Sequence, residues 1–190
     1  MLDTSFGEII ECKTLSTNDR SGASLLSEEL SKLIGQSVDV SVFEVEKEPI
    51  RRFADAVGDL NPIFWDEEYA KQSRFGSIIA PPGFVSSLWF LSRPVKWGRK
   101  EHESESLGPP LVMDALARAG YKRILDTGID YEFFEPIMAG DTVRAVCVVR
   151  DIMERGKGEA KAAFLITETS YSDVDGRMLA KARSTTVHQG

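Results

Sequence analysis

The feature that most constrains the fold is an apolar segment at residues 84–91, with the sequence Phe-Val-Ser-Ser-Leu-Trp-Phe-Leu. Only its two serines are polar, so a helix formed here has almost no face suited to water and must be enclosed by other elements. The later part of the chain predicts four long strands, at residues 123–134, 142–154, 160–172 and 178–187. The pattern therefore predicts an α+β fold in which an antiparallel sheet surrounds a buried helix.

Shorter elements are expected before the apolar segment. Alternation over residues 37–45 predicts a fifth strand, with four valines facing the core: Val38, Val40, Val42 and Val45. A sheet of about five or six strands follows from this count. Helices are expected at residues 26–34, 48–57, 67–71 and 111–120. The helix at 48–57 is expected to present Phe53, Ala56 and Val57 on one face.

Length and composition indicate one compact domain. The chain has 190 residues, 42% of them hydrophobic, which is enough for one substantial core and too little for two usual domains. Residues 1–22 are polar and mixed, so we expect a flexible or extended N-terminal arm followed by a single domain at 23–190. The polar, proline- and glycine-interrupted residues 92–111 predict a lid or a partner-binding loop.

Charge and cysteine content exclude several classes of function. A net charge of -7 is unsuited to binding a phosphate backbone, so no nucleic-acid partner is expected. No apolar run approaches the roughly 18 residues of a membrane span, and residues 1–4 lack the features of a secretory signal. Cys12 and Cys147 are too few for a disulfide framework or a metal cluster, and Cys147 reads as an inward strand residue. A cytoplasmic protein without a bound metal is therefore expected.

A turn carrying a carboxylate and an amide precedes the apolar segment. The expected helix ends at Gly58, and the pair Asn61-Pro62 then forces a turn that holds the Asp59 and Asn61 side chains close together. These side chains either serve the turn alone, by binding nearby backbone groups, or carry chemistry. Further along, Pro82-Gly83 opens the apolar helix, where unpaired backbone N–H groups can stabilise negative charge.

The chain resembles the MaoC-like hydratases and dehydratases in two signatures that occur in the family's order. The first covers residues 58–66 and 75–84, and the second covers Tyr131–Val143. The chain is most similar to the N-terminal, FAS1-like dehydratase type of domain. This resemblance implies the hotdog fold, an antiparallel sheet wrapped around one long buried helix. It also implies an enoyl-thioester substrate, carried by coenzyme A or an acyl carrier, that is hydrated to a 3-hydroxyacyl product without a separate cofactor.

One departure limits what the resemblance implies, because Phe64 stands where the catalytic hydratases carry their motif histidine. General acid–base catalysis contributes about 10²- to 10⁴-fold to a rate, so we expect the chain alone to be a poor hydratase. Domains of this type often pair with a complete MaoC-type subunit and supply the wall of the acyl tunnel. A homodimer or a heteromer with a second hotdog subunit, paired through edge strands, is therefore expected.

The resemblance assigns roles to eight residues. Asp59, Asn61 and the backbone N–H of Gly83 are the expected catalytic groups. The expected substrate-binding residues are Phe64, Trp65, Ile79, Pro82 and Phe84. For Phe64 and Trp65, an equally weighted interpretation is that they only fill the core. The basic pairs Arg51-Arg52 and Arg99-Lys100 are either contacts for coenzyme A phosphates or ordinary surface charges.

Alternative functions remain open from the sequence. The chain could be a non-catalytic acyl-CoA-binding or scaffolding hotdog protein. A thioesterase is less favoured, because such enzymes use an acid on or near the central helix and none occurs at residues 84–91. The two histidines, His102 in a charged run and His188 near the C-terminus, are expected in mobile surface positions rather than as replacements for the motif histidine.

Overall fold

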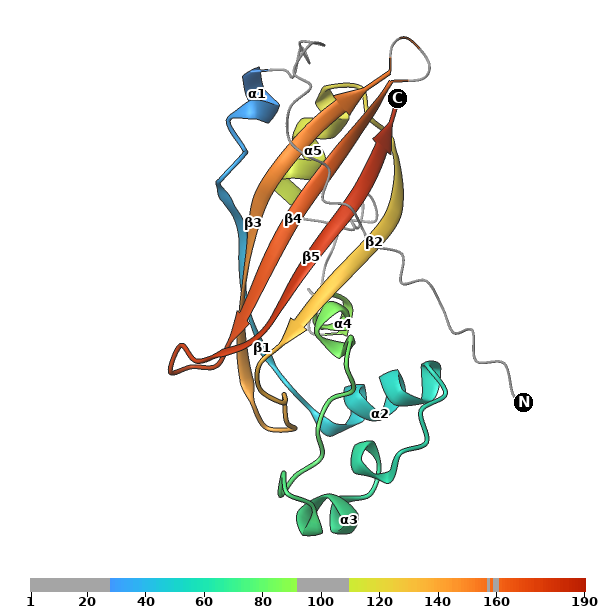
Figure 1. Ribbon diagram of the computed structural model, residues 1–190, viewed down its shortest axis with the longest axis vertical. Coiled ribbons are helices and arrows are strands. Elements are labelled where there is room, and N and C mark those ends of the chain that lie inside the picture. The colour runs from blue at the N-terminus through green and yellow to red at the C-terminus, as the bar shows by residue number, and fades with distance from the viewer. Residues whose placement is uncertain (1–27, 92–109, 157, 159–160) are drawn as a thin grey trace, which may run out of the picture.

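The computed structural model describes residues 28–91, 110–156, 158 and 161–190. Five antiparallel strands form one sheet in the order β1-β3-β4-β5-β2. They span β1 Ser37–Glu44, β2 Arg123–Phe133, β3 Thr142–Arg155, β4 Ala162–Ser172 and β5 Met178–Gln189. The predicted antiparallel sheet is confirmed, and Figure 1 shows its strands curving around the helices behind them.

Five α-helices and one 3-10 helix complete the described structure: α1 Glu28–Ser31, α2 Lys47–Ala56, η1 Pro62–Phe64, α3 Glu67–Gln72, α4 Phe84–Leu91 and α5 Pro110–Arg118. Figure 1 shows α5 and α4 along the same side of the sheet, while α2 and α3 extend beyond its lower end. The predicted buried helix is α4, which spans eight residues and whose Phe84, Val85 and Leu88 are at most 2% exposed. Among the described residues, α4 and α5 form the helical layer on this side of the sheet.

The core has two parts. The larger one joins α4 to α2, η1 and the lower halves of the strands, and it contains Ile50, Phe64, Phe84 and Tyr171. The smaller one lies under α5 and contains Val112, Leu116, Val149 and Leu165. Both motif regions predicted from the sequence belong to the larger part.

The predicted inward face of β1 is wrong for two of its valines. Phe43 of β1 and Val45 directly after it are buried, whereas Val40 and Val42 are 54% and 63% exposed. The Val38 side chain lies outside the described part of the structure. Alternation identifies two faces of a strand without saying which one is inward, and here the face with the phenylalanine packs into the core. The predicted burial of Val45 is confirmed, because it lies on the Phe43 side.

In α2, the buried residues are Ile50 and Ala54, one turn apart, and Phe53 packs beside them. Ala56 and Val57 are exposed because they lie beyond the part of the helix that contacts the core. Of the three residues predicted to share a face of this helix, Phe53 therefore packs against the core, while Ala56 and Val57 are exposed.

His188 is not in a mobile end, contrary to the prediction. It lies in β5, is 1% exposed, and pairs in register with Ala163 of β4 and Ile124 of β2. Cys147 faces inward as predicted and is 3% exposed. The predicted arm at 1–22, Cys12, the Arg99-Lys100 pair, His102 and nearly all of the predicted loop at 92–111 lie outside the described residues.

None of the described helices is long and apolar enough to cross a membrane.

Candidate functional site

The turn after α2 is held by its own polar side chains. Gly58 adopts a positive φ of 71°, which allows the chain to reverse after the helix. The Asp59 carboxylate accepts a hydrogen bond from the Asn61 N–H at 3.0 Å. The Asn61 side chain in turn accepts from the Ile63 N–H at 3.1 Å and caps η1. The structure therefore brings Asp59 and Asn61 together, with both side chains bonded to turn backbone.

The two aromatic residues after the turn occupy different environments. Phe64 is 5% exposed and belongs to the larger core cluster. Trp65 is half-buried, and its Nε1–H donates to the Asp59 carbonyl at 2.9 Å. An imidazole at position 64 would therefore lie in the core cluster, whereas the Trp65 ring packs against that cluster and bonds back to the turn.

A charged clamp holds this turn against α2 and α3. Arg51 donates through Nη2 to the Trp65 carbonyl at 3.0 Å and to the Glu67 carboxylate at 3.3 Å. Lys47 Nζ lies 2.7 Å from the same carboxylate, and this hydrogen bond, more than any other interaction, lowers the pKa of Glu67. Arg51 is thus engaged within the chain, while Arg52 pairs with Glu48 at the surface.

An aromatic residue of α2, Phe53, packs against the start of α4, and this contact was not predicted from the sequence. Gly83 has a φ of +88°, and the point that its Cβ would occupy lies 3.7 Å from Cζ of Phe53. The Phe53 ring meets Phe84 edge to face, with ring centroids 5.8 Å apart. Among the expected substrate-binding residues nearby, Phe84 is buried and Pro82 is exposed. The Phe53 ring thus packs beside the start of α4.

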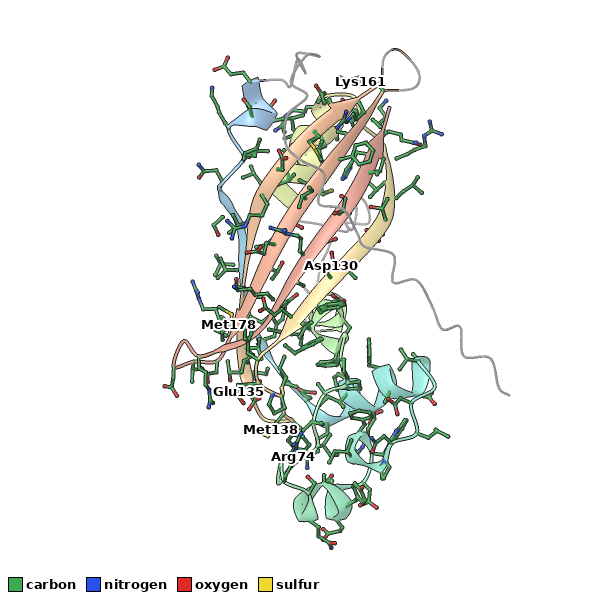
Figure 2. All side chains as sticks on the ribbon, in the orientation of Figure 1. Arg74, Asp130, Glu135, Met138, Lys161 and Met178 are labelled. Atoms are coloured by element: carbon green, nitrogen blue, oxygen red, sulfur yellow. The ribbon has the colours of Figure 1, made fainter. Side chains whose placement is uncertain are left out.

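The two signatures meet just before this helix. Ile79 forms an antiparallel bridge with Met138, flanked by a hydrogen bond from the Ala80 N–H to the Ile137 carbonyl at 2.7 Å. The loop around Met138 is closed by Asp141, whose carboxylate accepts from the Met138 N–H at 2.8 Å. Figure 2 shows Met138 below the sheet, on the side of the α2 and α3 layer. The fold therefore assembles both signatures at one end of the sheet.

A second polar contact lies on the helix side of the sheet. The hydroxyl oxygens of Ser86 in α4 and Tyr131 in β2 are 2.5 Å apart. Tyr131 begins the second signature, but no local pattern indicates a partner 45 residues away. Strand alternation could have placed the Tyr131 side chain on the helix side, whereas its hydrogen-bond partner depends on tertiary packing.

The buried histidine has its own environment, which the sequence also missed. His188 Nε2 lies 2.8 Å from the Thr186 hydroxyl, and burial lowers the pKa of His188 while the nearby Asp126 carboxylate opposes this shift. These groups belong to the β2–β5 pair, whereas the Asp59 turn belongs to the α2 and η1 layer. Within the residues that the structure describes, no cluster of three or more His, Cys, Asp or Glu side chains could hold a metal ion.

Comparison with known proteins identifies the family. Residues 32–182 match the model described as the FAS1-like dehydratase domain region. The UPF0336 protein of Saccharopolyspora erythraea is 32% identical over 148 residues, which cover 78% of this chain and 83% of that protein.

Solved structures share the fold at low sequence identity. The ChsH1-ChsH2 complex of Mycobacterium tuberculosis has a TM-score of 0.65 at 16% identity, covering 84% of this chain and 88% of the matched chain. The C-terminally truncated HadBC complex of the same organism, a 3R-hydroxyacyl-ACP dehydratase, has a TM-score of 0.55 at 21% identity, covering 81% and 99%. The chain therefore belongs to the FAS1-like dehydratase family of MaoC-like hotdog proteins.

Proposed function

We propose that this chain is the half of an enoyl-thioester hydratase or 3-hydroxyacyl dehydratase that builds the acyl tunnel beside a catalytic MaoC-type subunit. The observation that carries the proposal is Phe64, which stands at the motif histidine position and is buried in the core. The substrate in this proposal is a 2-enoyl or 3-hydroxyacyl thioester of coenzyme A or an acyl carrier.

The chemistry explains why a partner is needed. Hydration adds the water oxygen to the third carbon and a proton to the second, so one group must take a proton from water and another must deliver one. A phenyl ring does neither, and the Asp59 carboxylate already accepts a backbone hydrogen bond. In this proposal Gly83 retains only a supporting role, in which its backbone N–H stabilises charge on the thioester oxygen.

The β2 edge of the sheet, which is open among the described residues, supports pairing. Every residue of β2 except Tyr131 is exposed, and β2 is bonded to a neighbour, β5, on one side. Its exposed apolar side chains include Leu125, Ile129 and Phe133. An edge of this kind is normally covered by another chain or protected by charge. The two solved complexes described above are heteromers by name, which supports a hotdog partner.

Co-expression with a MaoC-type hotdog subunit that carries an intact Asp/His pair tests the proposal. We expect the two chains to purify together and to hydrate crotonyl-CoA or longer 2-enoyl-CoA esters, whereas this chain alone shows little water addition. Turnover by the chain alone at a typical enzymatic rate of about 10 s⁻¹ would contradict the proposal. Complex formation and acyl-CoA binding without any change in hydration would favour the scaffolding alternative.

The substitution Phe64→His in the chain alone is a second test of the proposed function. If the Asp59 turn still had the hydratase geometry, the imidazole would raise water addition by this chain. We expect no gain, because the position lies in the apolar core and the Asp59 side chain is bonded to its own turn. A clear gain in hydration would assign the chain its own latent catalytic site.

A further inference from the structure

A pair of hydroxyl groups lies between the buried helix and the open edge strand. Ser86 comes from α4 and Tyr131 from β2, and their oxygens are 2.5 Å apart. Figure 1 shows α4 beside the lower part of β2. Both residues are half-buried, so the pair lies at the boundary between the core and the exposed edge.

The surroundings of this pair are apolar. On α4, the neighbouring Val85 and Leu88 are at most 2% exposed. On β2, the residues two positions away are Ile129 and Phe133, which are 42% and 47% exposed. The Tyr131 ring stacks on the Phe133 ring, with centroids 5.6 Å apart. The hydroxyl pair therefore lies beside apolar side chains of α4 and β2, next to the edge strand.

The hydroxyl pair keeps hydrogen-bonding capacity. One proton lies between the two oxygens, so the second hydroxyl proton is free to donate, and both oxygens retain acceptor lone pairs. The adjacent Ser87 differs, because its hydroxyl donates to the Phe84 carbonyl of its own helix at 2.6 Å. Of the two serines in α4, Ser86 is thus the one directed at the sheet.

We propose that the Ser86–Tyr131 hydroxyl pair binds an oxygen atom on the acyl chain and makes this subunit favour hydroxyacyl thioesters over unsubstituted ones. The inference rests on the proposed function. The Ser86 N–H donates to the Gly83 carbonyl at 3.1 Å, so Ser86 lies one turn beyond the expected thioester position. Three residues rise about 4.5 Å along a helix, which is within reach of a hydroxyl on the third acyl carbon.

Calorimetric binding to the assembled complex tests this inference. The partner's motif histidine is replaced by alanine so that no ligand is consumed, and the probes are 3-hydroxybutyryl-CoA and butyryl-CoA. We expect the hydroxylated ligand to bind about 3- to 10-fold more tightly, the range for one neutral hydrogen bond. Tyr131→Phe and Ser86→Ala should each remove this preference, whereas Ser87→Ala, the matched control, should keep it. The partner's site is the same in every arm, so a difference between variants reports on this pair.

The outcomes separate the two proposals. If the complex binds both ligands equally, or if Tyr131→Phe in a folded complex keeps the preference, the specificity contact is wrong while the tunnel role stands. If neither ligand binds, the proposed function itself fails. Thermal melting of each variant shows whether it is folded, and Tyr131→Phe keeps the ring that stacks on Phe133.

Discussion

The turn at residues 58–65 and the edge strand β2 both carry family signature residues, yet they differ in how their bonding capacity is used. In the turn, three side chains bond to backbone groups of the same seven-residue segment: those of Asp59, Asn61 and Trp65. In β2, all residues but Tyr131 are exposed, and the strand is paired only with β5 in the described structure. The side chains of the turn are thus engaged within the turn itself, whereas β2 in the described structure keeps capacity for new contacts.

The face of the sheet away from the helices is less suited to an apolar partner. Arg150 donates a hydrogen bond to the Glu168 carboxylate at 2.6 Å and Arg183 lies 3.5 Å from it. The Arg150 hydrogen bond and then the two positive charges lower the pKa of Glu168 despite its partial burial. Figure 2 shows Asp130 midway along β2, where it is opposite Arg183 in register. Alternating charges of this kind favour solvent, so we expect a partner to approach along the apolar side of β2.

The largest effect should come from truncating the ring inside the turn. Phe64→Ala removes a side chain that is 5% exposed in the larger core cluster, and we expect a loss of about 3–5 kcal/mol in the free energy of unfolding. Leu60→Ala in the same turn is the control, because Leu60 is 81% exposed and should change stability by less than about 0.5 kcal/mol. Denaturant unfolding measures both. Similar losses for the two variants would contradict the core position of Phe64.

Charges on the edge strand should break assembly rather than folding. Ile129→Lys with Phe133→Lys adds two charges to the apolar side of β2, and we expect the dissociation constant of the complex to rise about 30- to 100-fold. Val42→Lys on β1 is the matched control, since Val42 is also exposed on an edge strand. Analytical ultracentrifugation compares them. If the Val42 variant dissociated the complex and the β2 variant did not, the interface would lie at β1 instead.

Removing the turn carboxylate should have a smaller effect. Asp59→Ala deletes the acceptor for the Asn61 N–H, a loss that corresponds to about 1 kcal/mol of stability. Hydration per folded complex should stay unchanged if the carboxylate serves only the turn. Activity and melting are measured on one preparation. A drop in activity much larger than the loss of folded protein would indicate that Asp59 takes part in the reaction.

The sequence predicted the strands well and their faces less well. Long apolar alternation placed β2 to β5 within about two residues, because a half-buried strand repeats every second residue and turns interrupt it. In β1 the face with Val40 and Val42 was predicted to point inward, whereas Phe43 on the opposite face is the residue that is buried. Which face is buried depends on neighbouring elements that are distant in sequence.

The candidate site was predictable only where it is local. Asp59 and Asn61 were expected to meet, since a single residue separates them within a turn that Pro62 enforces. The approach of Phe53 to Gly83 and of Ser86 to Tyr131 joins separate elements, so no local spacing indicated either contact. His188 was misplaced because position near a terminus is weak evidence against a strand that pairs on both sides.

The smallest effect concerns the buried histidine beside β2. Burial holds the pKa of His188 below its ordinary value of 6.5, so near and below that pH the unfolded chain binds a proton that the folded chain does not. Stability is therefore unaffected by this group above pH 6.5 and falls as the pH drops below it, down to the folded pKa. We expect this loss to be small, because the Asp126 carboxylate opposes the shift. Unfolding free energies between pH 7.5 and 5.5 measure it, with His188→Gln as the control. If the variant keeps the same pH dependence of stability as the parent chain, a group other than His188 is responsible for it.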